Sequence, residues 1–299
     1  MLSVHTLRKR PKRRKPVDNP REHPVTCHTR GMSPQELPSL TPGQSFAVRD
    51  ALRMGYTRSQ LAGPRYSRPF HGVRVLADPQ EPSPDTHHDR VYGLARAYMP
   101  LMRPEWAFSH TTALVLWGCP IRGSEDLHVS VGDRRGASEA KGIRGHRHRA
   151  KIRSTEVAGL RIADPDLAIA QSGLLLSFTD LVVAIDHLIR PGSASRAPII
   201  SRETLGRLLD EHSFEGVVPA RKAWLASEVG AESRMETILR LRLAQHGIRG
   251  LDLQVEIFDD AGFVGRFDMA DRLRRIIYEY DGEQHRIDRA QYLKDIQRL

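Results

Sequence analysis

The acidic side chains near the C-terminal end of the sequence have types and spacing that suit a metal-dependent reaction. Glu279 and Asp281 stand two residues apart in an apolar segment, so in a strand both would face one side, about 7 Å apart. Asp268 lies on the preceding segment, where strand alternation gives it the same face as Arg266. If the two segments pair in register, three carboxylates converge. Like charges so placed raise one another's pKa or require a cation.

Mg²⁺ is the cation that such a cluster would favour. It binds hard oxygen ligands and keeps positions for water, so it could activate a water and stabilise charge on a scissile phosphate. His285, just past the last of these acids, could act as an acid or a base. A structural interpretation also stands, in which Asp268 and Glu279 are exposed sheet residues paired with a nearby arginine. The candidates for that arginine are Arg266 and Arg274.

Local sequence patterns predict the elements that would position these acids. Ser233 and Glu236 have the spacing of a helix capping box, which by itself explains Glu236, and the apolar period of that helix ends at Gly247. Alternating apolar residues then predict three strands joined by short turns, followed by a helix. The strands are expected at Leu253–Phe258, Phe263–Ala270 and Arg275–Asp281, and the helix at Arg289–Arg298.

The N-terminal part has the layout of a DNA-binding module. Helical patterns at Gln44–Met54 and Arg58–Ala62 flank a glycine turn, and Arg65–Val75 has the pattern of a small β-hairpin. Helix, turn, helix and hairpin together form a winged helix-turn-helix. The residues expected to contact DNA are Arg58, Ser59, Gln60, Arg65, Arg68 and Arg74. Spacing alone leaves open a helical hairpin that merely packs on its neighbour.

The middle of the chain predicts a mixed α/β region without a stated chemistry. Helices are expected at Val91–Met99, Thr111–Leu116, Leu167–Gln171, Phe178–Ile189 and Arg202–Asp210, and a strand at Leu127–Val131. His146 and His148 alternate as on one strand face, which suggests a metal or phosphate site. No third ligand is close in sequence, so a solvated strand edge is favoured. The pair Ser109-His110 has no visible acidic partner and is interpreted as a helix cap.

Charge points to an anionic partner but is unevenly distributed. The 299 residues hold 46 Lys or Arg and 36 Asp or Glu, a net charge of +10. Residues 1–32 contain nine cations and two acids, a net +7, so the remaining chain carries only +3. Residues 1–40 are expected to be a disordered basic tail. We favour a solvated tail, or a coding start that lies ahead of the true one at Met32, over a phosphate-binding arm.

Composition excludes several classes of protein. Cys27 and Cys119 are too few and too far apart for a disulfide framework or a cysteine-based zinc site. The longest apolar stretch, Leu167–Ile189, is interrupted by two aspartates and a glutamine, which a membrane span would not carry lightly. The basic start is followed by prolines and an aspartate rather than the apolar segment of a signal peptide. We therefore expect a soluble protein of the reducing cytoplasm.

The C-terminal motifs form an ordered string. It runs through Ser233-x-x-Glu236, Gln254-Val255, Gly265-Arg266-Phe267-Asp268, Tyr278-Glu279-Tyr280-Asp281-Gly282-x-x-His285 and Tyr292-x-x-Asp295-x-x-Arg298. Residues 232–299 thereby resemble the Vsr-like (very-short-patch-repair-like) endonucleases, a branch of the PD-(D/E)xK nuclease fold. The resemblance implies a restriction-endonuclease-like α/β domain.

Site residues follow from this resemblance position by position. It implies that Glu236, Asp268 and Glu279 bind the metal. Asp281 falls where the wider superfamily has lysine, a departure that is usual in this branch, so no residue is assigned to the activation of water. The family pattern continues past the last helix of the string with a strand and a closing helix. We expect either further sequence after Leu299 or a sheet that is one strand smaller, with an exposed edge.

The front of the chain has a looser resemblance of its own. It rests on Phe46–Val75, Ser109-His110-Thr111-Thr112-Ala113 and Trp117-Gly118-Cys119-Pro120. These stretches are similar to AbiEi-like antitoxins of type IV toxin–antitoxin systems. The likeness implies a winged helix-turn-helix followed by an α/β domain and strengthens the expectation of DNA binding. A shared architecture does not by itself imply that a toxin is neutralised.

Together these patterns predict an α/β (α+β) protein in four parts. The parts are a basic tail at 1–40, the winged helix-turn-helix at 41–78, an AbiEi-like α/β domain at 88–220 and a Vsr-like endonuclease domain at 228–299. The expected function is a Mg²⁺-dependent DNA endonuclease whose N-terminal module holds the duplex. The first alternative is a DNA-binding regulator or type IV antitoxin-like protein with an inactive nuclease-like domain, and the second is an α/β protein without a DNA role. DNA is the expected partner and a membrane is not; a homodimer is compatible with the sequence, and no toxin partner is established.

Overall fold

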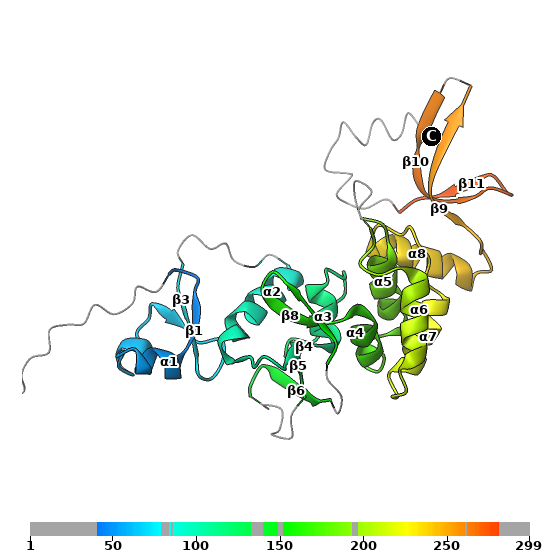
Figure 1. Ribbon diagram of the computed structural model, residues 1–299. Coiled ribbons are helices and arrows are strands. Elements are labelled where there is room, and N and C mark those ends of the chain that lie inside the picture. Colours follow the sequence, from blue (N-terminus) through cyan, green and yellow to red (C-terminus); the bar gives the residue numbers. More distant parts are fainter. Residues whose placement is uncertain are drawn as a thin grey trace, which may run out of the picture. The chain divides into compact units, whose positions relative to one another are not determined.

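Three sheets with intervening helices make up the described part of the chain (Figure 1). The computed structural model describes residues 41–78, 84, 86–132, 140–148, 152–192, 197–260 and 262–280. Helices and strands are interspersed along these residues, so the predicted α+β class is confirmed. The expected basic tail at 1–40, the residues Asp281 and His285, and the expected helix at Arg289–Arg298 lie outside the described residues.

A small antiparallel sheet near the start of the described chain has the strand order β1-β3-β2. Its strands are β1 (Ser45–Ala47), β2 (Tyr66–Ser67) and β3 (Val73–Leu76). The hairpin expected within Arg65–Val75 is present as β2 and β3. Between β1 and β2 lie the helix α1 (Val48–Arg53) and the short 3-10 helix η1 (Gln60–Ala62).

Both helices predicted in this region are shorter than expected. Residues 45–47 form a strand because pairing with β3 buries Phe46 and Ala47, and α1 begins only afterwards. Phe46 also packs edge-to-face on Tyr66, with ring centroids 5.7 Å apart. Tertiary pairing thus overrides the local helical pattern, and the second predicted helix is reduced to η1.

The central sheet is mixed, with the strand order β6-β5-β4-β8-β7. Its strands are β4 (Ala107–Phe108), β5 (Leu127–Val131), β6 (Ile143–Arg147), β7 (Ser154–Val157) and β8 (Leu160–Ala163). The pairs β5–β6 and β4–β8 are parallel, whereas β4–β5 and β7–β8 are antiparallel. The strand predicted at Leu127–Val131 is confirmed. Strand β4 has only two residues, too few for an alternating pattern to predict it.

Six α-helices precede, interrupt or follow these strands within the described residues. They are α2 (His87–Tyr98), α3 (His110–Leu116), α4 (Pro165–Ser172), α5 (Phe178–Ile189), α6 (Arg202–Glu211) and α7 (Val217–Leu225), and α2 runs on into a 3-10 turn, η2 (Met99–Leu101). Hydroxyl caps begin three of them, since Thr86, Ser177 and Ser201 each accept a hydrogen bond from the backbone N–H three residues on. None of the described helices is long and apolar enough to cross a membrane.

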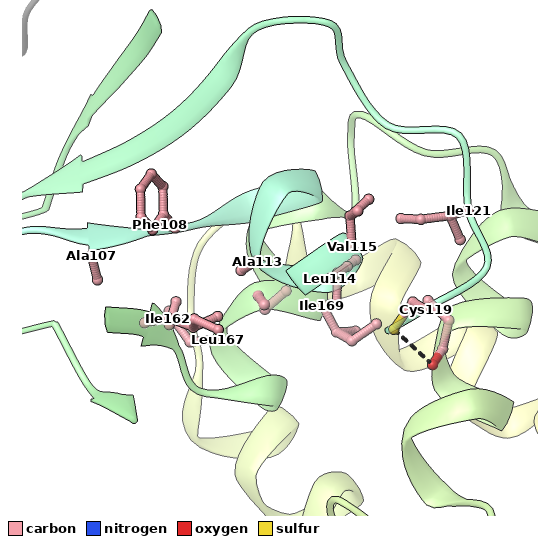
Figure 2. Packing of buried hydrophobic residues seen from close by; sticks show 14 of the residues in the cluster. Ala107, Phe108, Ala113, Leu114, Val115, Cys119, Ile121, Ile162, Leu167 and Ile169 are labelled. Atoms are coloured by element: carbon pink, nitrogen blue, oxygen red, sulfur yellow. Dashed lines mark hydrogen bonds between the residues drawn. The ribbon is translucent and has the colours of Figure 1, made fainter. Parts of the chain in front are cut away.

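Figure 2 shows the buried core that joins the central sheet to its helices. Phe108 on β4 pairs with Ile162 on β8, and these side chains are almost fully buried, as are those of Leu114 on α3 and Ile169 on α4. Cys119 closes the cluster, with its Sγ 3.7 Å from the carbonyl oxygen of Ala184. Burial raises the pKa of the Cys119 thiol far above its ordinary value, so this cysteine packs as an apolar residue rather than serving as a nucleophile.

The C-terminal described part is a helix followed by an antiparallel meander. Helix α8 (Arg234–Gln245) precedes β9 (Asp252–Asp259), β10 (Gly262–Asp271) and β11 (Ile276–Tyr278), and the strand order is β11-β10-β9. The predicted helix and the first two predicted strands are confirmed. The third strand, predicted at Arg275–Asp281, is shorter: it begins one residue later, because Arg275 has a φ of 55° and belongs to the turn, and it ends at Tyr278, so Glu279 is not on it.

Candidate functional site

The C-terminal meander brings three polar positions, Gln254, Asp268 and Glu279, near one another, and we call them, with Glu236, the acidic row. Met269 on β10 pairs with Leu253 on β9 and with Tyr278 on β11. Asp268 adjoins Met269 on β10, Gln254 adjoins Leu253 on β9, and Glu279 directly follows Tyr278, the last residue of β11. The expected pairing of the second and third strands is present, but Glu279, which was expected on the third strand, lies one residue past its end.

The carboxylate of Asp268 is held by the chain just beyond β11. The backbone N–H of Tyr280 donates to Asp268 Oδ2 over 3.0 Å. This bond joins the residue after Glu279 to Asp268, so the two acidic positions are tied together through the backbone. Asp281, the next residue, and His285 lie outside the described residues, and their roles stay predictions.

Glu236 reaches the same row from helix α8. Ser233 Oγ accepts a hydrogen bond from the Glu236 N–H over 3.1 Å, as the predicted cap requires. The Glu236 carboxylate does not complete the capping box: its Oε2 accepts from the N–H of Glu232 over 2.8 Å and from Nε2 of Gln254 over 2.9 Å. The capping box alone therefore does not account for Glu236, whose side chain is directed to β9 instead.

The electrostatics of Glu236 reflect its neighbours. Burial raises the pKa of the Glu236 carboxyl above its ordinary value, and the negative charge of Asp268 raises it further, while the hydrogen bond from Glu232 opposes both. Two carboxylates from different elements are thus close enough to repel each other. A bound cation would remove that repulsion.

Gln254 is a site residue to which the sequence assigned no role. It lies in the motif Gln254-Val255, and its amide joins β9 to the Glu236 carboxylate. Its φ of 54° falls in the left-handed region, which a side chain other than glycine adopts only at a cost. The strain sits at the position where strand β9 meets the two acids.

In the structural interpretation, Asp268 and Glu279 would pair with Arg266 or Arg274 instead of binding a metal. Arg266 forms an ion pair with Glu232, and Arg274 forms one with Asp271 at a distance of 2.6 Å. Both arginines therefore have other acidic partners. The two arginines that were expected to pair with Asp268 are thus paired with Glu232 and Asp271.

Helix α8 is anchored on its other side by a buried acid of α5. Asp186, 1% exposed, accepts hydrogen bonds from Arg240 Nη2 over 2.7 Å and from Thr237 Oγ1 over 2.8 Å. Its other oxygen accepts from the Glu228 N–H over 2.8 Å. One face of α8 is therefore fixed to the central helices while Glu236 faces the meander.

The predicted DNA-contacting residues all lie around the small N-terminal sheet. Arg74 donates to the carbonyl oxygens of Leu61 and Val73 over 2.8 and 2.7 Å, and Arg68 donates to that of Ala62 over 2.6 Å. These two arginines fasten the hairpin to η1.

The other residues predicted to contact DNA either bond to near neighbours in the sequence or are exposed. Arg65 donates to Tyr66 Oη over 2.6 Å, and the Gln60 amide oxygen accepts from the Thr57 N–H over 2.7 Å. Ser59 and Arg58 are exposed, and the Ser59 hydroxyl lies 3.0 Å from that of Thr57. Of the four arginines in this set, Arg58 is the one without a hydrogen bond or ion pair to another described residue, whereas Arg65, Arg68 and Arg74 each donate to one.

The structure also contains a cluster of three histidines that the sequence patterns did not predict. His110 begins α3, His128 lies on β5 and His146 lies on β6, and one ring nitrogen of each lies within 4.8 Å of the others. His146 was predicted to lie on a solvated strand edge: β6 is an edge strand of the central sheet, as predicted, but His146 is partly buried beside His110 and His128 rather than solvated. The ligands come from three elements, so nothing in the local sequence around His146 indicated them.

The histidine cluster is held in its neutral form. Burial lowers the pKa of His110 to about 2 and that of His128 to about 4, with the charge of a protonated His146 opposing protonation of either. The pKa of His146 itself is lowered, first by burial and then by Arg144. Neutral imidazoles offer lone pairs at physiological pH.

Comparisons with known proteins do not assign the chain to a family. No protein-family model matches it, and no curated protein sequence gives a significant match. The resemblances to Vsr-like endonucleases and AbiEi-like antitoxins therefore stay predictions from motifs.

Proposed function

We propose that this chain is a metal-dependent DNA endonuclease that hydrolyses phosphodiester bonds at the acidic row of its C-terminal meander. The observations that support the proposal are the hydrogen bond between Gln254 and Glu236 and the bond from the Tyr280 N–H to Asp268, which ties the residue after Glu279 to that acid. The three carboxylates come from α8 (Glu236), β10 (Asp268) and the residue just past β11 (Glu279).

The donor chemistry suits Mg²⁺. Carboxylate oxygens are the hard ligands that this ion prefers, and a cation beside Glu236 would offset the burial, and the smaller repulsion from Asp268, that raise the pKa of this carboxyl. Glu236, Asp268 and Glu279 would hold the ion. When bound, Mg²⁺ would supply Lewis-acid stabilisation of charge on the phosphate and a more acidic water.

The remaining residues act by positioning. Gln254 fixes one oxygen of Glu236, and the Tyr280 N–H fixes one oxygen of Asp268, so neither carboxylate has to be ordered when substrate binds. The N-terminal module, with Arg58 exposed, would hold the duplex through its phosphates. Asp281 and His285 are proposed to complete the site on the strength of the motif.

The direct test is a plasmid-nicking assay of the full chain with and without Mg²⁺. We expect nicking by the wild type that is abolished by EDTA and reduced at least about a hundredfold by Asp268→Asn. Asp210→Asn, which removes an exposed carboxylate on α6, is the matched control and should nick as the wild type does. Nicking that survives Asp268→Asn would overturn the proposal.

DNA-binding measurements on the same preparation distinguish the nuclease hypothesis from the regulator hypothesis. A chain that never nicks DNA but binds one sequence selectively without metal would be the DNA-binding regulator with an inactive nuclease-like domain. Affinity that ignores salt would support neither, because phosphate contacts release counterions.

A further inference from the structure

We propose that His110, His128 and His146 form a transition-metal site, with Zn²⁺ as the best-fitting ion, that is separate from the acidic row. Imidazole nitrogens are ligands that Zn²⁺ favours and Mg²⁺ does not. The site is independent of the proposed nuclease function, since it lies on α3 and two strands of the central sheet.

The distances are close to those that a metal needs. His128 Nδ1 and His146 Nε2 are 2.8 Å apart, and a nitrogen of His110 lies within 4.8 Å of both ligand atoms. Zn–N bonds of about 2.0–2.1 Å in a tetrahedron put nitrogens about 3.3 Å apart. The close pair would open by about half an ångström and the third ring would move inward, which rotations of side chains can supply. The ion would take the place of the proton now shared between His128 and His146.

The backbone around the cluster is already fixed. The Ser109 N–H donates to the His128 carbonyl oxygen over 2.9 Å, and the His128 N–H donates to Thr112 Oγ1 over 2.8 Å, so α3 is tied to β5 at the cluster. Strands β5 and β6 pair in parallel, with Ser130 opposite His146. Metal ligands need this kind of rigid placement.

Orienting contacts are present as well. Ser109 Oγ lies 2.9 Å from His110 Nδ1, which holds that ring in place as the outer partners of metal-bound histidines do. His110 also has a φ of 53°. Of the residues other than glycine that the structure describes with such a φ, two lie in hairpin turns and the others are His110 and Gln254, one at each candidate site.

A purely structural role leaves one feature unexplained. His128 is 2% exposed, and its Nδ1 lies 2.8 Å from Nε2 of His146. An apolar residue would pack at this buried position without bringing two imidazole nitrogens together. The polar pair inside a stack of three rings is better explained by a ligand that the rings share.

The cluster opens onto a cavity of about 630 Å³. His110 and His146 line this cavity, whereas His128 lies behind them. The other polar side chains of the lining are Ser130, Arg147, His148, Gln171 and Glu215. A bound ion would thus have three imidazoles and one position open to the cavity. Three neutral ligands leave its charge uncompensated, so we expect a water, a hydroxide or a small anion in the fourth position.

The test is Co²⁺ absorption of the full chain, prepared without a histidine tag, combined with metal analysis after Zn²⁺ loading and dialysis. We expect the strong visible absorption of four-coordinate Co²⁺, one Zn²⁺ per chain, and a spectral change when azide is added. His146→Gln and His110→Gln should each weaken binding at least about a hundredfold. His148→Gln, which changes a histidine of the same cavity outside the cluster, is the matched control and should leave binding unchanged.

Several outcomes would overturn the site. The absence of visible Co²⁺ absorption in the wild type would do so, as would absorption that persists in both His146→Gln and His110→Gln. Near-ultraviolet circular dichroism of each variant identifies any that does not fold, and the two variants test different elements. Asp268→Asn should leave the Co²⁺ spectrum unchanged, since an oxygen-ligated ion absorbs only weakly. Failure of the nuclease proposal would therefore not be mistaken for failure of this one.

Discussion

Gln254 Nε2 lies 2.9 Å from Glu236 Oε2, and this single hydrogen bond joins the first strand of the meander to the helix before it. Both residues belong to elements that the sequence predicts separately. Their contact brings helix α8 and strand β9 together at the candidate site. Gln254, which makes it, has a strained backbone with a φ of 54°.

Substitutions of Gln254 should separate its side chain from its backbone. Gln254→Ala and Gln254→Gly both remove the amide, so we expect each to raise the Mg²⁺ concentration needed for half-maximal nicking by about tenfold or more. Glycine also relieves the φ of 54°, so Gln254→Gly should unfold with a free energy about 1 kcal/mol higher than Gln254→Ala. Urea denaturation measures the second effect. Equal stability of the two variants would show that the φ carries no strain.

Arg240 should be needed for folding rather than for chemistry. Arg240→Met leaves Asp186 buried without its charge partner, and we expect a loss of about 3–5 kcal/mol in the free energy of unfolding. Arg207→Met, which breaks an exposed pair with Glu211 on α6, should cost about 0–1 kcal/mol. Chemical denaturation of both variants checks the contrast, and a similar small cost for the two would contradict it.

His187 should make stability depend on pH in the weakly acidic range. Burial, and then the charge of Arg190, lowers the pKa of His187 to about 4. An unfolded histidine binds its proton near pH 6.5. Between these values the unfolded chain binds more protons, so the free energy of unfolding should fall as pH falls, by at most about 1.4 kcal/mol per pH unit from this residue.

The measurement for His187 compares denaturation curves between pH 7 and about pH 4. His187→Gln should have a shallower dependence on pH than the wild type. His246→Gln, which changes an exposed histidine at the end of α8, should follow the wild type. A steeper dependence in His187→Gln would mean that the sign is wrong.

Two arginines of the N-terminal sheet should behave differently toward DNA. Arg58→Ala removes an exposed charge, so it should weaken DNA binding and lower the slope of log affinity against log salt by about 1 without changing stability. Arg74→Ala removes two hydrogen bonds to carbonyl oxygens and should cost about 1–3 kcal/mol of stability. Fluorescence anisotropy at several salt concentrations and thermal melts provide the readouts. Arg53→Ala on α1 is the control, and loss of DNA affinity equal to that of Arg58→Ala would remove the special role of Arg58.

Sequence patterns predicted best where local signals mark the element. Helix α5 begins at Phe178 and ends at Ile189 as predicted, because a serine cap precedes an apolar segment that ends before a Pro-Gly pair, although the helix is buried on nearly all sides. The first two strands of the meander were predicted because their apolar residues alternate. Strand β1 was predicted as helix, because only its pairing with β3 explains it.

The two candidate sites differ in how far the sequence could reveal them. The acids follow one another along a meander, so spacing alone suggested that Asp268 and Glu279 meet. His128 and His146 are 18 residues apart and meet only because β5 and β6 pair in parallel, a relationship that no local pattern encodes. The interval between His110 and His128 is filled by α3 and a loop, which hide the proximity in the same way.

The anchoring of α8 by Asp186 has a practical meaning for dissecting the protein. A fragment that began at residue 228 would contain Thr237 and Arg240 without Asp186, the acid they bind. The face of α8 that packs on α5 would then be exposed to solvent. The smallest piece able to display Glu236 in its native setting therefore begins ahead of α5. Helix α8, which carries a candidate catalytic acid, thus connects the central helices to the meander, and a fragment that keeps the site must include both.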